Sequence, residues 1–358
     1  MYVYLHIPFC LHICSYCDFP KMLYDKKIVK KYLSCLEDEI KKRYLGEEVV
    51  SIYIGGGTPS VLDLEELEYL FRLTKLFHLS SKVEFTVESN IESLDREKIK
   101  LFSLYGVNRV SLGVQSFHEE TLTVLGRKHN QKMVEEVVQN LKDEGIFNLS
   151  IDYIYGVNSD IHEVEEDIAS FLKLDIPHFS AYSLIIEDHT LFGICKRDYI
   201  DDTVEVEMYK KICKLLTEHG YHHYEISNYA LSGYESIHNL NYWNNGSYYG
   251  FGLGAVSYLS FKRMSNTKNM HKYLEGEYIA DIIREDIQTR ISNEFILGLR
   301  KIEGIDTEAF FQKYQMDILK IDGVRKLILE GKLVYLNHHL FIKEKYLYLS
   351  NEILLYFV

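Results

Sequence analysis

Apolar residues along the chain follow two periods, one typical of strands and the other of helices. Six short runs rich in β-branched and aromatic residues predict strands, and they cover residues 2–7, 49–54, 83–87, 109–114, 149–155 and 178–184. Amphipathic stretches between them predict helices: residues 28–44, a helix capped by Ser93 and ended by Gly106, one capped by Asn130, and one beginning near Asp160. Successive strand–helix units of this kind predict an α/β fold whose parallel sheet curls into a partial (β/α)6 barrel.

Polar residues gather where the predicted strands end. They are the cysteine-rich stretch after the first strand, the segment from Gly55 to Thr58, Glu88, Gln115 and Asp152. Active sites of parallel α/β barrels are built at this edge, although ordinary connecting loops are polar as well. A carboxylate inside a barrel strand, such as that of Asp152, needs a partner to be tolerated there. The pattern therefore favours a ligand site at the mouth of the barrel.

The last part of the chain has a different organisation. From about Asp286 the alternation stops, and a helical run through Ile296 and Leu299 precedes helices near residues 307–314 and 324–330. Two short strands then flank Asn337-His338 as a hairpin. This order predicts a winged-helix-like domain at 286–358 after a domain at 1–285, in which residues from about 186 to 285 extend the barrel. We expect the C-terminal domain to contact a protein or to cover the barrel.

Composition limits the partners. The chain has 358 residues, 47% of them hydrophobic, and a net charge of -13. The negative charge argues against nucleic acid or an anionic membrane as the main partner. No apolar run is long enough to span a bilayer. Only nine residues precede Cys10, which leaves no room for a secretory signal, so we expect a cytoplasmic protein whose thiols stay reduced.

Three of the six cysteines, Cys10, Cys14 and Cys17, fall within eight residues. Thiolates suit zinc or iron–sulfur, and a zinc site would need completion by His6 or His12 because no CxxC or HxxxH pair occurs elsewhere. Three unrelated thiols are the other alternative. Three thiolates on a four-iron cluster would leave one iron open for chemistry. The remaining cysteines are most simply interpreted as packing residues: Cys35, Cys195 and Cys213.

The CxxxCxxC motif, preceded by Tyr4-Leu-His-Ile-Pro-Phe9, resembles the radical S-adenosylmethionine (SAM) superfamily, in the branch of the oxygen-independent coproporphyrinogen III oxidases and their heme-chaperone relatives. The resemblance implies a [4Fe–4S] cluster on the three cysteines and SAM at its open iron. The segment 125–129 matches the LGRxH motif of this branch, and the glycine run at 55–57, weak by itself, matches its SAM-binding segment. The residues that the resemblance places around SAM are Tyr4, Tyr16, Gly56, Gly57, Thr58, Glu88, Gln115, Arg127 and Asp152.

Two later segments, 224–230 (YEISNYA) and 238–243 (HNLNYW), have aromatic and histidine residues that are usually packing residues. The HNxxYW pattern is nevertheless similar to the signature of the radical SAM heme chaperones. This implies heme near His238, Asn239, Tyr242 and Trp243. The glycine-rich segment 250–255 continues the match, but many relatives have a histidine where this chain has Val256, which weakens any iron ligation from that position.

The resemblance leaves two functions: a heme chaperone that delivers heme to an acceptor protein, and a coproporphyrinogen III oxidase. Oxidases usually have a fourth cysteine where Phe19 stands and an extension before the cluster motif, so we expect the chaperone. Its partners would be heme, a heme-accepting protein and an electron donor for the cluster. The sequence does not decide whether the protein contacts a membrane peripherally, forms a homodimer or binds a second SAM. It also leaves open whether SAM is cleaved, and therefore whether the protein is an enzyme.

Overall fold

The computed structural model describes residues 1–358, and its main element is a curved nine-stranded sheet. Six of its strands are parallel and lie side by side in sequence order. They are β1 (Tyr2–Ile7), β4 (Val49–Gly56), β5 (Leu79–Asn90), β6 (Arg109–Gln115), β7 (Asn148–Tyr155) and β8 (His178–Ser183). Each overlaps one of the predicted strands, so the α/β class and the partial barrel are confirmed.

Short strands extend the sheet at both edges. β11 (Tyr249–Phe251) lies parallel to β1, while β10 (Asn228–Ala230) lies antiparallel to β8 and is followed by β9 (His222–Glu225). The sheet order runs from β11 to β9 without closing, which leaves the barrel open on one side. The sequence did not predict these strands because three or four residues are too few to show an alternation.

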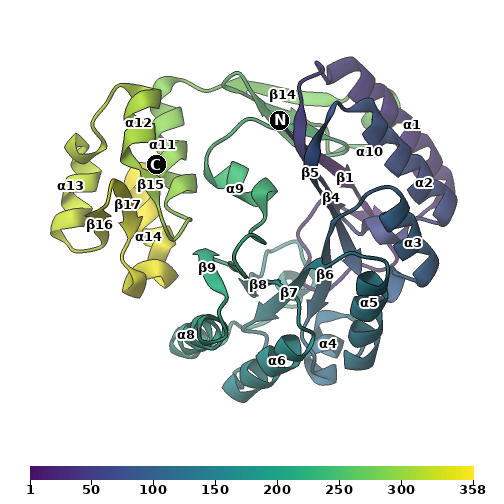
Figure 1. Ribbon diagram of the computed structural model, residues 1–358, viewed down its shortest axis with the longest axis horizontal. Helices are drawn as coiled ribbons and strands as arrows, with labels where there is room; N and C mark the ends of the chain where they lie inside the picture. Colours follow the sequence, from purple (N-terminus) through teal and green to yellow (C-terminus); the bar gives the residue numbers. More distant parts are fainter.

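Helices cover the outer face of the sheet (Figure 1). They are α1 (Lys26–Arg43), α2 (Leu64–Leu73), α3 (Arg96–Leu104), α4 (Glu119–Leu125), α5 (Gln131–Asp143), α6 (Ile161–Lys173) and α8 (Asp202–Glu218). Asn130 and Asp160 cap α5 and α6 as predicted. The prediction that Ser93 caps α3 is wrong: the Asp95 side chain accepts the hydrogen bond of the Lys98 amide, whereas the Ser93 hydroxyl donates to the Asn90 carbonyl.

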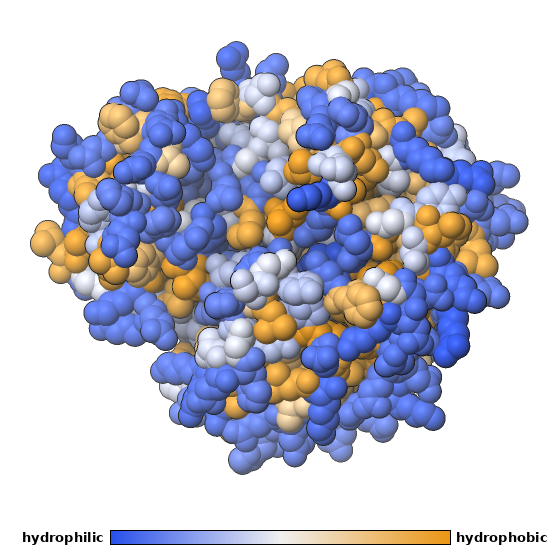
Figure 2. Space-filling view, viewed as in Figure 1, coloured by the Kyte–Doolittle hydropathy of each residue, from blue (hydrophilic) through white to orange (hydrophobic).

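Side chains alternate along each strand, so one face of the sheet packs in the hydrophobic core and the other face lines the candidate site. In β1, Val3, Leu5 and Ile7 are fully buried in the main hydrophobic core, which includes residues of α1. Tyr4 and His6 point to the opposite face and line a cavity inside the barrel. Hydrophilic residues cover most of the outer helices in Figure 2, and hydrophobic ones gather around the central hollow.

The remaining elements surround the open side of the barrel. They are β2 (Phe9–Cys10), β3 (Met22–Leu23), α7 (Leu191–Ile194), α9 (Ile237–Trp243), β12 (Val256–Leu259), β13 (Lys262–Asn266), α10 (Met270–Leu274) and β14 (Ile279–Arg284). In Figure 1, α9 lies in the middle of the molecule, between the barrel strands and the C-terminal elements. This placement brings the HNxxYW segment to the interior.

The C-terminal elements form a helical group with a small sheet, and their buried residues belong to the same hydrophobic cluster as the barrel core. These elements are α11 (Ile287–Gly298), β15 (Ile305–Asp306), α12 (Thr307–Tyr314), α13 (Asp322–Leu329), β16 (Leu333–Leu336), β17 (His339–Ile342) and α14 (Ser350–Leu354). The predicted hairpin turns at Asn337 and His338, which both have positive φ as the tightest hairpin turns require. No helix combines the length and the apolar composition that a membrane-spanning segment requires.

Candidate functional site

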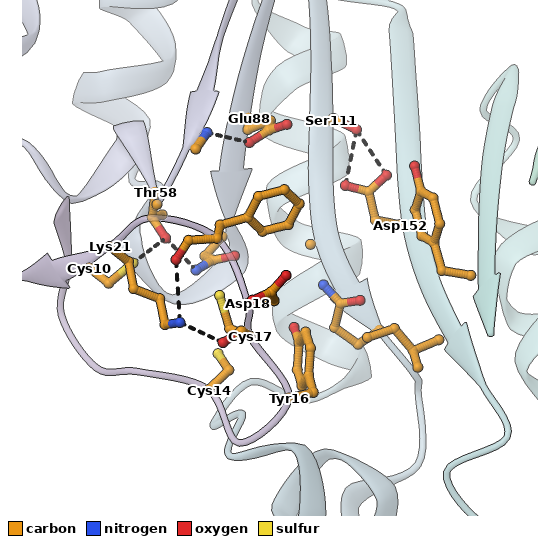
Figure 3. A pocket seen from close by; sticks show the side chains of 18 of the residues that line it. Cys10, Cys14, Tyr16, Cys17, Asp18, Lys21, Thr58, Glu88, Ser111 and Asp152 are labelled. Carbon is orange, nitrogen blue, oxygen red and sulfur yellow. Dashed lines mark hydrogen bonds between the residues drawn. The ribbon is translucent and has the colours of Figure 1, made fainter. Parts of the chain in front are cut away.

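The three clustered cysteines lie on one loop that closes back on itself. β2 pairs with β3, and the amides of Met22 and Tyr24 donate to the carbonyls of Pro8 and Cys10 at 2.7 and 2.9 Å. The loop between these strands brings all three cysteines to the wall of one cavity of about 410 Å³, which we call the first cavity (Figure 3). The other three cysteines do not line it.

The donor set of this loop fits a [4Fe–4S] cluster better than a zinc ion. Both ring nitrogens of His6 are in use, with the Tyr4 hydroxyl at 3.0 Å and the Pro20 carbonyl at 2.9 Å. His12 lines the first cavity with its Nε2 unpaired, but it does not lie in one single-ion ligand group with the cysteines. No group of three or more His, Cys, Asp or Glu side chains is placed to hold a single metal ion. A four-iron cluster makes a different demand, because each thiolate binds an iron of its own.

Hydrogen-bond donors lie beside two of the sulfurs. The Thr58 hydroxyl is 3.8 Å from the Sγ of Cys10, and the Nη1 of Arg127 is 3.9 Å from the Sγ of Cys14. Arg127 also donates to Glu92 and to the Gly113 carbonyl. Burial acts to raise the pKa of Glu92, but its bond from His129 and the charge of Arg127 outweigh burial and lower that pKa to about 2. Arg127 is therefore held at the cysteine loop by a fixed negative charge.

The glycine run at the end of β4 forms the next wall of the first cavity. The Gly56 amide donates to the Glu88 carboxylate at 2.9 Å, and φ of Gly56 is +115°, a conformation that favours glycine. Thr58 accepts a hydrogen bond from Asn90 at 2.9 Å. Asn90 lies in the cavity too, and sequence reasoning missed it because a lone asparagine at a strand end carries no signal.

Half-buried carboxyls of β5 and β7 form the wall opposite the cysteines. Ser111 of β6 donates to Asp152 of β7 at 3.0 Å (Figure 3). Burial, with the nearby charge of Glu88, raises the pKa of Asp152 to about 7. Burial also raises the pKa of Glu88, against the opposing effect of its bonds from the Gly56 amide and Tyr53. Gln115 reaches the same cavity from a β-bulge and has a φ of +71°.

The structure therefore brings together eight of the nine residues expected around SAM. Those that line the first cavity are Tyr16, Gly56, Gly57, Thr58, Glu88, Gln115, Arg127 and Asp152. Tyr4 is the exception, because it lines a neighbouring second cavity of about 880 Å³. Glu88 and Asn239 line both cavities.

The HNxxYW residues share the second cavity. His238, Asn239, Tyr242 and Trp243 all line it from α9, and so does Val256 at the position where many relatives have histidine. The imidazole of His238 is buried, with Nδ1 2.8 Å from the Ser51 hydroxyl and Nε2 3.0 Å from the Tyr242 hydroxyl. Burial, and then the charge of Arg109, lower the pKa of His238 to about 3, so its ring is neutral.

Asp152 predicts a pH dependence of stability. Its pKa in the folded protein, about 7, is above the ordinary value of 3.8, so the folded state binds the proton more tightly and loses stability as the pH rises through this interval. From about pH 5 to about pH 6 we expect the free energy of unfolding to fall by about 1.4 kcal/mol per pH unit from this group, and at about half that slope near pH 7. Urea unfolding, followed by the fluorescence of the single tryptophan, should show a flatter profile for Asp152→Asn. Equal slopes in both proteins would contradict the expectation.

Comparison with known proteins identifies a family match, similar sequences and a similar solved structure. Residues 4–172 match the family model of the radical SAM superfamily. The chain is 40% identical to the heme chaperone HemW of Lactococcus lactis, over 93% of this chain and 90% of the relative. It is 38% identical to the heme chaperone HemW of Bacillus subtilis, over 87% of this chain and 86% of that relative. The structure resembles coproporphyrinogen III oxidase (HemN) from Escherichia coli with a TM-score of 0.87 and 19% identity, over 99% of this chain and 89% of that one, which establishes the fold alone.

Proposed function

The chain belongs to the radical SAM superfamily and, within it, to the HemW family, and from this premise we propose that it binds heme and delivers it to an acceptor protein. The observation that carries the proposal is the second cavity. It is large enough for a ligand of this size, it lies beside the first cavity, and its wall includes all four residues of the HNxxYW motif.

Membership of the superfamily implies a [4Fe–4S] cluster and SAM as cofactors. A cluster with one open iron binds SAM and supplies one electron to its sulfonium group. We assign the cluster to Cys10, Cys14 and Cys17, which face the first cavity together. The half-buried carboxyls of Glu88 and Asp152 line the same cavity and are suited to bind SAM hydroxyl and amino groups and to keep the cavity polar.

The residues of the second cavity favour heme binding by aromatic packing over heme binding through a tight iron ligand. Tyr242 and Trp243 present apolar rings to the second cavity, and a flat apolar macrocycle gains most from such contacts. Both nitrogens of His238 already have partners, so iron ligation by Nε2 requires the Tyr242 hydroxyl to move away. A delivery protein must release its cargo, and an attachment that competes with an internal hydrogen bond suits that task.

A hemin titration tests the proposal. We expect a Soret band that saturates with the wild-type protein and a loss of affinity of about tenfold or more in the double variant Tyr242→Leu/Trp243→Leu, because two aromatic contacts are removed. Tyr335→Leu, a surface tyrosine of the C-terminal hairpin, is the matched control and should bind hemin like the wild type. Equal affinity in the double variant and the wild type would count against heme in this cavity.

An activity assay distinguishes the proposed function from the alternative, an oxygen-independent coproporphyrinogen III oxidase. Phe19, where oxidases usually have a further cysteine, is 65% exposed at the rim of both cavities and offers no thiolate. We expect no protoporphyrinogen when cluster-loaded protein is incubated with coproporphyrinogen III, SAM and dithionite. Formation of product over many turnovers would replace the chaperone proposal with the oxidase.

A further inference from the structure

Five residues that line the second cavity each have a buried polar atom without any hydrogen-bond partner. These atoms are the hydroxyl of Tyr209, Oε2 of Glu225, Oδ1 of Asn228, Nε1 of Trp243 and Nε of Arg300. Buried polar atoms in folded proteins are nearly always hydrogen-bonded, so a group of unpaired ones in residues that line a cavity indicates side chains that can turn to pair with a ligand. We call these five residues the unpaired cluster.

The unpaired cluster is assembled where the C-terminal elements meet the barrel. Tyr209 comes from α8 and Trp243 from the end of α9, while Glu225 and Asn228 flank the turn between β9 and β10. Arg300 follows α11, and its carbonyl accepts the Ile226 amide at 3.1 Å. A neighbouring β-bridge joins Glu225 to residue 301, so the backbone that carries Arg300 is fixed to the barrel side of the cavity.

The guanidinium of Arg300 is the positively charged group of the unpaired cluster, and it has no ion-pair partner. Its carbon lies 4.7 Å from the ring centre of Trp243, a cation–π contact that orients the group, yet the side chain forms no hydrogen bond or salt bridge within the protein. No other Lys or Arg lines the second cavity. Glu225 is close enough to feel the charge, but its Oε1 is already bonded to Ser227 and Asn228.

We propose that Arg300 is the carboxylate-binding residue of the heme site and that it holds a propionate group, with Trp243 and Tyr209 as further donors. A planar guanidinium binds a carboxylate through two parallel hydrogen bonds, and heme is a flat apolar molecule whose only charged substituents are its carboxylates. Burial raises the pKa of Glu225 against the opposing effect of Arg300. The assignment rests on the proposed heme function and adds to it the side of the cavity where the propionates lie.

The test compares hemin with hemin dimethyl ester, which has the same macrocycle without the negative charges. Both are titrated into the wild-type protein, Arg300→Gln, Arg300→Lys and the control Arg284→Gln, which removes the same charge from the exposed strand β14. Hydrogen bonds to a charged group predict that Arg300→Gln binds hemin about tenfold to a hundredfold more weakly than the wild type, with Arg300→Lys in between. The ester should bind the wild type and Arg300→Gln equally, and Arg284→Gln should behave like the wild type.

The outcomes separate this inference from the proposed function. If the wild type binds hemin but Arg300→Gln binds it equally well, or loses the same factor for hemin and ester, Arg300 does not hold a carboxylate and only this inference is wrong. If the wild type binds no hemin, the proposed function is wrong and this inference with it. Equal far-UV circular dichroism and equal urea midpoints of wild type and variants establish that the comparison is made on folded proteins.

Discussion

Replacing Cys14 by alanine is expected to abolish assembly of an intact [4Fe–4S] cluster. Cys10, Cys14 and Cys17 are the three thiols that face the first cavity, and the loss of Cys14 leaves two thiolates for the cluster. After anaerobic reconstitution with iron and sulfide, we expect the wild type to show the broad visible absorbance of such a cluster. Cys14→Ala should lose most of this absorbance and most of its bound iron and sulfide.

The chain offers a matched control for this experiment. Cys195 is an exposed cysteine outside both cavities, so Cys195→Ala removes one thiol without touching the cysteine loop. We expect Cys195→Ala to be reconstituted like the wild type. Full cluster absorbance in Cys14→Ala would show that the cluster has other ligands and would contradict the assignment.

Substitution of Gly56 by alanine is expected to cause the largest loss of stability among single conservative changes in the glycine run. A Cβ at this position would lie 2.4 Å from the His6 ring, and that ring is held through both nitrogens by Tyr4 and Pro20. The positive φ of Gly56 costs ~1–2 kcal/mol for any other residue. The clash adds roughly 2 kcal/mol or more, because the ring and the backbone must both shift.

Gly46→Ala separates these two contributions. Gly46 has a φ of +97°, yet a Cβ there would meet nothing within 4 Å, so its substitution carries the backbone cost without the clash. We expect the urea midpoint to fall in the order wild type, Gly46→Ala, Gly56→Ala, with SAM binding weakened only in the last. Equal destabilisation by both substitutions would show that the contact with His6 is not rigid.

Much of the barrel could be predicted because its strands are long enough to show their alternation and because the helices between them carry caps. The start of α3 was misplaced since Ser93 and Asp95 are both good capping residues, and only tertiary contacts decide that the Ser93 hydroxyl bonds elsewhere. The edge strand β11 was missed for a different reason. Its three residues join the sheet through pairing with β1, which is distant in sequence.

The candidate site also contains residues that the sequence predicts and residues that it does not. Cysteines and glycines at short spacing were recognised from the sequence, and the structure brings them to one cavity. Ser111, Asn90 and Arg300 were not recognised, because each acquires its role from a neighbour on another strand or in the C-terminal group. The separation of Tyr4 from the other SAM candidates follows from the direction of its side chain into the second cavity, which a motif does not encode.

The two cavities have walls in common. Glu88, Tyr53 and Asn239 each line both, so molecules in the two cavities can contact the same side chains. If one occupant rearranges these residues, the binding free energy of the second changes where its contacts with them differ. Linkage makes such an effect reciprocal: if one occupant weakens the other by some factor, it is itself weakened by the same factor. Binding and release in the first cavity and in the second cavity would then form a single coupled equilibrium.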